Sequence, residues 1–178
     1  MPPIWSRSSH ACARRPATSP TRSRSRIRSD ARVHPRAGHP GDPAEVYAAS
    51  LDPQLHVASM ARHAERMVHG PEGDTFTEGS TVTWSARHFG IRFRLTSVVF
   101  DLDPPHRFCD RQLRGPFGAF FHEHVFRPLP EGTLMRDTIV FRSPLGPLGR
   151  LVDRLFLLRY MRRLITERNE TLTRELEG

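Results

Sequence analysis

The stretch that decides the fold is LGRLVDRLFLLRYMRRLITERNETLTREL, residues 148–176. Its apolar side chains recur at helical spacing, at positions 148, 151, 152, 155, 158, 161, 165, 172 and 176. The opposite face is charged, with Arg150, Arg154, Arg162, Arg163, Glu167 and Glu170. The pattern predicts one long amphipathic helix of about 40 Å, at about 1.5 Å per residue. Its apolar stripe must lie against another layer, and a sheet is the partner that the rest of the chain offers.

Strands are predicted upstream of this helix, where apolar and polar residues alternate. The predicted strands cover residues 80–88, 91–102, 106–114, 119–127 and 133–142. In the first of them Val82, Trp84 and Ala86 share one face with His88. Short loops rich in Gly and Pro separate the strands. Consecutive strands with short connections pair antiparallel, so we expect a β-meander.

Two short helices are predicted before the strands, at residues 42–50 and 52–61. Each begins with an aspartate that can cap the helix, Asp42 or Asp52, followed by a proline at the first helical position. The predicted folded domain therefore covers residues 42–178.

Residues 1–41 are rich in Arg, Ser and Pro and have no hydrophobic period, so we expect a disordered tail. A transit peptide, an incorrect start or shifted reading frame, and an RNA-binding arm are alternatives. Residues 1–43 carry nine Arg against two acids and so account for +7 of the net charge of +8. Because the remaining residues are nearly neutral, we expect no nucleic-acid partner. The sequence contains no apolar run long enough for a membrane helix and no secretory h-region, so we expect a cytoplasmic protein. The oligomeric state stays open.

A longer motif runs through the last three strands into the helix. It comprises Phe108-Cys109-Asp110-Arg111-Gln112, Gly115-Pro116-Phe117, Phe120-Phe121-His122-Glu123-His124-Val125-Phe126, Gly132-Thr133, Asp137 and Pro144-Leu145-Gly146-Pro147-Leu148-Gly149. The combination resembles the START/SRPBCC superfamily, and in particular its bacterial polyketide cyclase-like proteins, over about residues 44–172. The resemblance implies an α+β helix-grip fold, in which a curved antiparallel meander wraps on the long C-terminal helix.

One feature of that superfamily is weak here. Its members begin with a strand of alternating apolar residues, whereas residues 24–41 offer only Ile27 and Val33 and contain Pro35 and Pro40. We therefore expect the first strand to be degraded or missing.

The resemblance also implies a cavity between sheet and helix that holds lipids, sterols or polyketides. Polar residues converge on the same strand faces as aromatic ones, which is typical of a small-molecule site. If the 115–118 turn is tight, Gln112 lies opposite His122 and Asp110 lies opposite His124, with Asp137 near His124. The predicted ligand-binding residues are Trp84, Phe93, Asp110, Gln112, Phe117, Phe120, His122, His124, Asp137 and Ile139.

Three interpretations of the His-x-His pair stay open. His122 and His124 form a structural hydrogen-bonding pair or face solvent, or they contact a ligand, or they transfer protons with Asp137. The ligand types of His122, His124 and Asp110 or Asp137 allow metal binding, but the chain has no Cys ligand set and no HExxH helix, so we expect no metal and no cofactor. The first functional hypothesis is a non-catalytic carrier or sensor of a small apolar ligand. The alternatives are a polyketide cyclase/dehydratase-like enzyme and an interaction module without a ligand.

Overall fold

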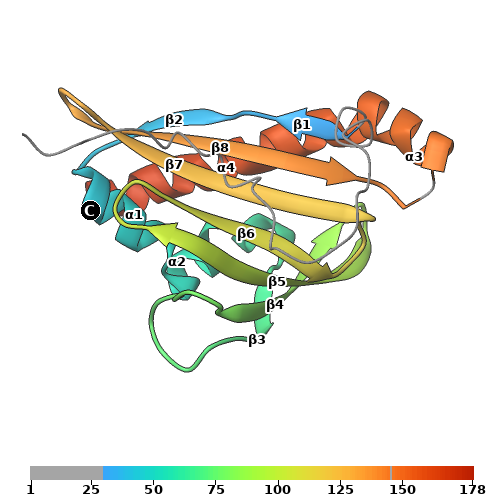
Figure 1. Ribbon diagram of the computed structural model, residues 1–178, viewed down its shortest axis with the longest axis horizontal. Coiled ribbons are helices and arrows are strands. Elements are labelled where there is room, and N and C mark those ends of the chain that lie inside the picture. Colours follow the sequence, from blue (N-terminus) through green and yellow to red (C-terminus); the bar gives the residue numbers. More distant parts are fainter. Residues whose placement is uncertain (1–29, 145) are drawn as a thin grey trace, which may run out of the picture.

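The computed structural model describes residues 30–144 and 146–178. The tail predicted to be disordered comprised residues 1–41, of which residues 1–29 lie outside the described part. An antiparallel sheet of eight strands forms the main layer, in the order β1-β8-β7-β6-β5-β4-β3 with β2 also on β8 (Figure 1). The strands are β1 Ala31–Val33, β2 Arg36–His39, β3 Arg66–His69, β4 Thr81–His88, β5 Ile91–Asp103, β6 Arg107–Arg114, β7 Ala119–Leu129 and β8 Gly132–Arg142.

The predicted meander is confirmed as β4 to β8, with each boundary within two residues of the expected one. The two-residue turn between β4 and β5 consists of Phe89 and Gly90, both with positive φ (54° and 79°). This is the backbone of a type I′ hairpin turn, whose twist matches that of the flanking strands. The edge strand β3 was not predicted, because only four residues form it and they do not alternate.

The first strand is not missing but is broken into the two short pieces β1 and β2, so of the expected outcomes, degraded or missing, the structure shows the degraded one. β1 and β2 both pair with β8, with Val33 opposite Ile139 and Ala37 opposite Met135. The Asp137 amide donates to the Pro35 carbonyl (3.1 Å) and keeps the two pieces aligned across the break. Backbone pairing to a long neighbouring strand holds this segment, so few apolar residues are needed. The folded part of the chain therefore begins before residue 42.

Two short helices, α1 Pro43–Ser50 and α2 Pro53–Ser59, follow the first strands as predicted. The Asp42 carboxylate accepts from the amides of Ala44 and Glu45, and the Glu45 side chain accepts from the Asp42 amide, which completes a capping box. The Asp52 carboxylate accepts from the amides of Gln54 and Leu55 and so caps α2 without a capping box. A short 3₁₀ turn, η2 Ala61–His63, leads into β3.

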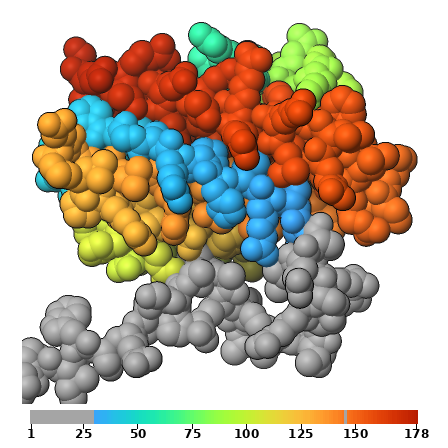
Figure 2. Space-filling model, turned by 90° about the horizontal axis from the view of Figure 1, so that it is seen from above, coloured from blue at the N-terminus to red at the C-terminus, as the bar shows by residue number. Residues whose placement is uncertain are grey.

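The C-terminal helix consists of three consecutive parts: α3 Gly146–Val152, the π-helical turn η3 Asp153–Leu157, and α4 Leu158–Glu177. α4 lies along β1 and β2, as seen from above in Figure 2, and its apolar face is buried. Over the described residues, no helix is both long and apolar enough to span a bilayer.

The predicted apolar stripe is only partly correct. Met161, Ile165 and Leu172 are buried, but Leu148, Leu151 and Leu155 are exposed by 61%, 53% and 54%. The π-helical turn explains the difference. In it the Leu158 amide donates to the Asp153 carbonyl, five residues back, so the positions before and after the turn lose their common helical phase. α3 also extends beyond the end of the sheet (Figure 1).

The interior contains two apolar clusters instead of one continuous core. The first joins α1 to β4, β5, β6 and β7 and includes Tyr47, Phe108 and Phe126. The second joins α4 to β1 and β8 and includes Val33 and Phe141. Side chains of both clusters line a cavity between sheet and helix.

Candidate functional site

The cavity has a volume of about 400 Å³ and lies between the inner face of β4–β7 and the helix α4. This volume falls within the range typical of small-molecule sites, about 300–1,000 Å³. Most of its wall is apolar or aromatic, and it includes the predicted Trp84, Phe93, Phe117 and Phe120. Arg168 of α4, which is 5% exposed, also lines it.

Residues that the sequence did not indicate also line the cavity where the β4–β5 hairpin meets the start of α4. The ring of Phe89 lies 4.5 Å from that of Tyr160, and His88 Nδ1 lies 2.5 Å from the Tyr160 hydroxyl. Figure 2 shows the hairpin, in light green, beside the orange-red part of the helix. A turn residue and a tyrosine on the charged side of the predicted helix carry no pattern that marks them as cavity residues.

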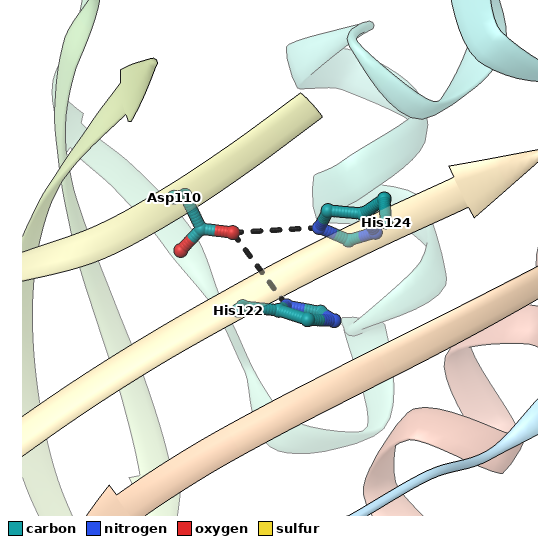
Figure 3. Close-up of side chains that lie close together, drawn as sticks. All are labelled: Asp110, His122 and His124. Atoms are coloured by element: carbon teal, nitrogen blue, oxygen red, sulfur yellow. Dashed lines mark hydrogen bonds and ion pairs between the residues drawn. The ribbon is translucent and has the colours of Figure 1, made fainter. Parts of the chain in front are cut away.

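Three polar side chains converge on one wall of the cavity (Figure 3). Asp110 projects from β6, and His122 and His124 project from the same face of β7. Asp110 Oδ2 lies 3.5 Å from His122 Nδ1 and 3.4 Å from His124 Nε2. The two imidazole rings are 3.8 Å apart between centroids. The His-x-His pair therefore faces the interior, and the solvent-facing interpretation is wrong.

Asp137 lies behind the two histidines and has no exposed surface. Its Oδ1 accepts a hydrogen bond from His122 Nε2 at 2.9 Å, and His124 Nδ1 lies 3.0 Å from the same oxygen. Asn169 Nδ2 donates to Oδ2 at 2.7 Å, and Arg168 Nη1 lies 3.8 Å from Oδ1. The Asp137 carboxylate thus orients His122 by a hydrogen bond, contacts His124, whose own hydrogen bond goes to Asp110, and is itself held by α4.

These contacts shift the pKa values of the cluster. Burial would raise the pKa of Asp137, but the two imidazoles outweigh burial and hold it well below its usual value. The pKa of Asp110 is lowered in the same way, mainly by the hydrogen bond with His124, against the effect of burial. Burial, followed by the proximity of His124, lowers the pKa of His122. Both carboxylates are therefore ionised at neutral pH, while His122 favours its neutral form.

The predicted register between β6 and β7 is wrong by two residues. Asp110 pairs with His122 instead of His124, and Phe108 takes the position opposite His124. The loop is wider than a tight turn because Gln112 binds it from inside: its amide donates to the Phe117 carbonyl at 2.8 Å and its oxygen accepts from the Phe117 amide at 3.3 Å. The predicted pairing of Asp137 with His124 is confirmed.

Seven of the ten predicted site residues line the cavity, and three do not. Gln112 organises the loop, Asp137 supports the histidines from behind, and Ile139 is fully buried in the second apolar cluster. Ile139 shares a strand face with Asp137, as expected. Side chains of α4 pack against Ile139, so it does not reach the cavity.

The sheet, the long helix and the interior cavity define a helix-grip protein. The profile of the family described as "Polyketide cyclase / dehydrase and lipid transport" matches residues 16–177, and the chain belongs to this family. Among curated proteins, none matches the chain significantly.

Solved structures share the fold at low sequence identity. A START superfamily protein from Mycobacterium smegmatis is 10% identical, with a TM-score of 0.64 over 83% of this chain and 97% of that one. The protein TTHA0849 from Thermus thermophilus is 20% identical, with a TM-score of 0.62 over 79% of this chain and 96% of that one. StfQ, a di-domain ARO/CYC protein from the steffimycin biosynthetic pathway, is 15% identical, with a TM-score of 0.69 over 86% of this chain and 53% of that one.

Proposed function

We propose that the chain binds a small hydrophobic molecule, such as a lipid or polyketide, in the cavity between sheet and helix and acts as a carrier or sensor without catalysis. The observation that carries this proposal is a cavity of about 400 Å³ whose wall is mostly apolar and aromatic. Transfer of an apolar ligand from water into a cavity of this size and lining is favourable.

The arrangement of the wall supports a ligand with a polar group on an apolar body. Phe93, Phe117 and Phe120 offer apolar surface, while Asp110, His122 and His124 form one polar region of the wall. A few placed polar groups in an apolar site orient a ligand. A flat or ring-containing molecule that carries an oxygen substituent fits this division.

Native mass spectrometry of the full chain purified from cells tests the proposal. We expect an adduct that is lost on denaturation and that a delipidated sample regains when the extracted compound is added. Trp84 provides a second readout, because its indole lines the cavity and stacks on His56 at 4.1 Å between centroids. Ligand uptake should change the fluorescence of the wild type much more than that of Trp84→Phe. Absence of both an adduct and a fluorescence change would refute the proposal.

A second candidate is an enzyme of the cyclase/dehydratase type, in which His122 or His124 transfers protons with Asp137. The observation that favours it is the pair of imidazoles on the cavity wall, held by carboxylates that fix their tautomers. His122→Gln and His124→Gln would then abolish conversion of the bound compound and retain its uptake. If the compound is recovered chemically unchanged after incubation with the wild type, the result supports the carrier instead.

A further inference from the structure

We propose that Asp110, His122 and His124 form a binding site for one divalent transition-metal ion, such as Zn²⁺, in the wall of the cavity. This proposal departs from the expectation of no metal, which gave the absence of a Cys ligand set and of an HExxH helix more weight than the ligand types of these residues. Here the ligands come together from two paired strands (Figure 3). The proposal is independent of the hydrophobic ligand, because the ion needs only these three side chains.

The spacing of the ligand atoms suits such an ion. One atom from each of the three residues lies within 4.8 Å of the other two. Asp110 Oδ2 is 3.5 Å from His122 Nδ1 and 3.4 Å from His124 Nε2. Bonds of about 2.0–2.1 Å place tetrahedral ligand atoms about 3.4 Å apart. The two separations from Asp110 therefore already match those around a bound Zn²⁺.

Counting protons provides a second, independent argument. The two imidazoles make four nitrogen–carboxylate contacts, two with Asp137 at 2.9 and 3.0 Å and two with Asp110 at 3.5 and 3.4 Å. Two neutral imidazoles carry only two N–H groups. His124 hydrogen-bonds to Asp110 through Nε2, and its Nδ1, 3.0 Å from Asp137, is left without a hydrogen bond; an ion bound at Nε2 would shift the proton to Nδ1, where it faces Asp137. His122 gives its N–H to Asp137, so its Nδ1 lone pair faces the Asp110 carboxylate at 3.5 Å and is repelled by it. A cation among these three atoms turns that repulsion into coordination.

Protonation of both rings would also fill the four contacts, but the geometry opposes it. The ring centroids of His122 and His124 are 3.8 Å apart, so two imidazolium ions would repel each other strongly at this distance. The surrounding charges point the same way. Asp110 and Asp137 bring two negative charges and Arg168 one positive charge, which leaves one negative charge among these groups when both imidazoles are neutral.

The residues behind the histidines complete the arrangement. Metal-binding histidines usually donate their second N–H to a carboxylate, which fixes the tautomer and the ring orientation. Asp137 takes this position for His122 and lies 3.0 Å from His124 Nδ1, in place to accept its N–H once Nε2 is a ligand, and Asn169 holds Asp137 with a 2.7 Å hydrogen bond. Three protein ligands leave a coordination position for water or for an oxygen atom of a bound molecule, and the cavity provides the space for it.

Titration of the metal-free full chain with Co²⁺ at neutral pH tests the site, with visible absorption and calorimetry as readouts and Zn²⁺ as competitor. We expect one equivalent to bind with the d–d bands of a four- or five-coordinate ion. His122→Gln and His124→Gln should each weaken binding about 100-fold or more, and Asp137→Asn about 10–100-fold. His69→Gln, on the exposed edge strand β3, serves as the matched control and should bind like the wild type.

Circular dichroism verifies that each variant is folded. If the buried histidine variants do not fold, Asp110→Asn decides the question, because Asp110 is only partly buried and loses its charge without losing its shape. Failure of the wild type to bind one equivalent, or unchanged affinity in the folded ligand variants, would overturn the metal site. Ligand uptake is measured separately in metal-free protein through Trp84, so failure of the metal site and failure of the proposed function are distinguishable.

Discussion

Nε2 of His122 lies 2.9 Å from Oδ1 of Asp137, a carboxylate with no exposed surface. The same carboxylate accepts from Asn169 and lies near Arg168, which is itself buried. The polar wall of the cavity is therefore also the contact that joins β7 and β8 to α4. Stability and site geometry depend on the same atoms.

This shared dependence predicts a large cost for removing Asp137. Asp137→Ala leaves the Arg168 guanidinium buried without its carboxylate, and we expect a loss of about 3–5 kcal/mol in the free energy of unfolding, measured in urea. Asp103→Asn is the control, since Asp103 is 59% exposed and lies 3.9 Å from Arg107, and we expect a change below about 1 kcal/mol. Equal effects of the two substitutions would contradict the buried network.

We expect the lowered pKa of His39 to account for part of the pH dependence of stability. His39 is 2% exposed, and burial, followed by the charge of Arg168, lowers its pKa. In the pH range between the folded and unfolded pKa values the unfolded chain binds more protons, so stability falls as the pH drops below the ordinary histidine pKa of 6.5. His122 contributes in the same direction. Urea unfolding of His39→Gln should show a smaller decline than the wild type, and an unchanged decline would refute a role for His39.

Tyr47 packs its ring against two aromatic neighbours, but its hydroxyl is buried without a hydrogen-bond partner among the described residues. The ring centroids of Phe108 and Phe126 lie 5.7 and 5.5 Å away. Tyr47→Phe removes only the unsatisfied group, so we expect the free energy of unfolding to rise by up to about 1 kcal/mol. Tyr47→Ala should cost about 3–5 kcal/mol. A clear loss of stability in Tyr47→Phe would show that the hydroxyl has a partner.

The two halves of the C-terminal helix should respond differently to loss of an apolar side chain. Leu155 is 54% exposed, so Leu155→Gln should change the free energy of unfolding by no more than about 0.5 kcal/mol. Ile165 is 6% exposed in the second apolar cluster, and Ile165→Ala should cost about 2–5 kcal/mol. Thermal and urea unfolding measure both. A large loss in Leu155→Gln would instead support one continuous buried stripe.

Local chemistry accounts for the parts of the fold that the sequence predicted. The alternation in β4 and the Asp-Pro starts of α1 and α2 depend on residues that are close in the chain. The features that it did not predict depend on distant partners. β1 and β2 are held by backbone pairing to β8, and the π-helical turn changes the helical phase without a marker in the residue pattern.

The candidate site shows the same division. The strand faces placed His122 and His124 together correctly, because period-two alternation determines which residues share a face. The residue of β6 that was predicted to lie opposite each histidine was wrong, because the register depends on how Gln112 holds the 115–118 loop. Tyr160 and Phe89 meet only because a hairpin packs on a helix, and the sequence of neither segment predicts that contact.

Filling the cavity tests the central claim most directly. Ala86 is 5% exposed and lines the cavity, whereas Arg87, the next residue on β4, is exposed on the other face of the strand. Ligand occupancy is measured by native mass spectrometry and Trp84 fluorescence in Ala86→Phe and, as matched control, Arg87→Phe. We predict that Ala86→Phe remains folded but lowers occupancy about tenfold or more, while Arg87→Phe binds like the wild type. Equal occupancy in the two folded variants would contradict binding inside this cavity.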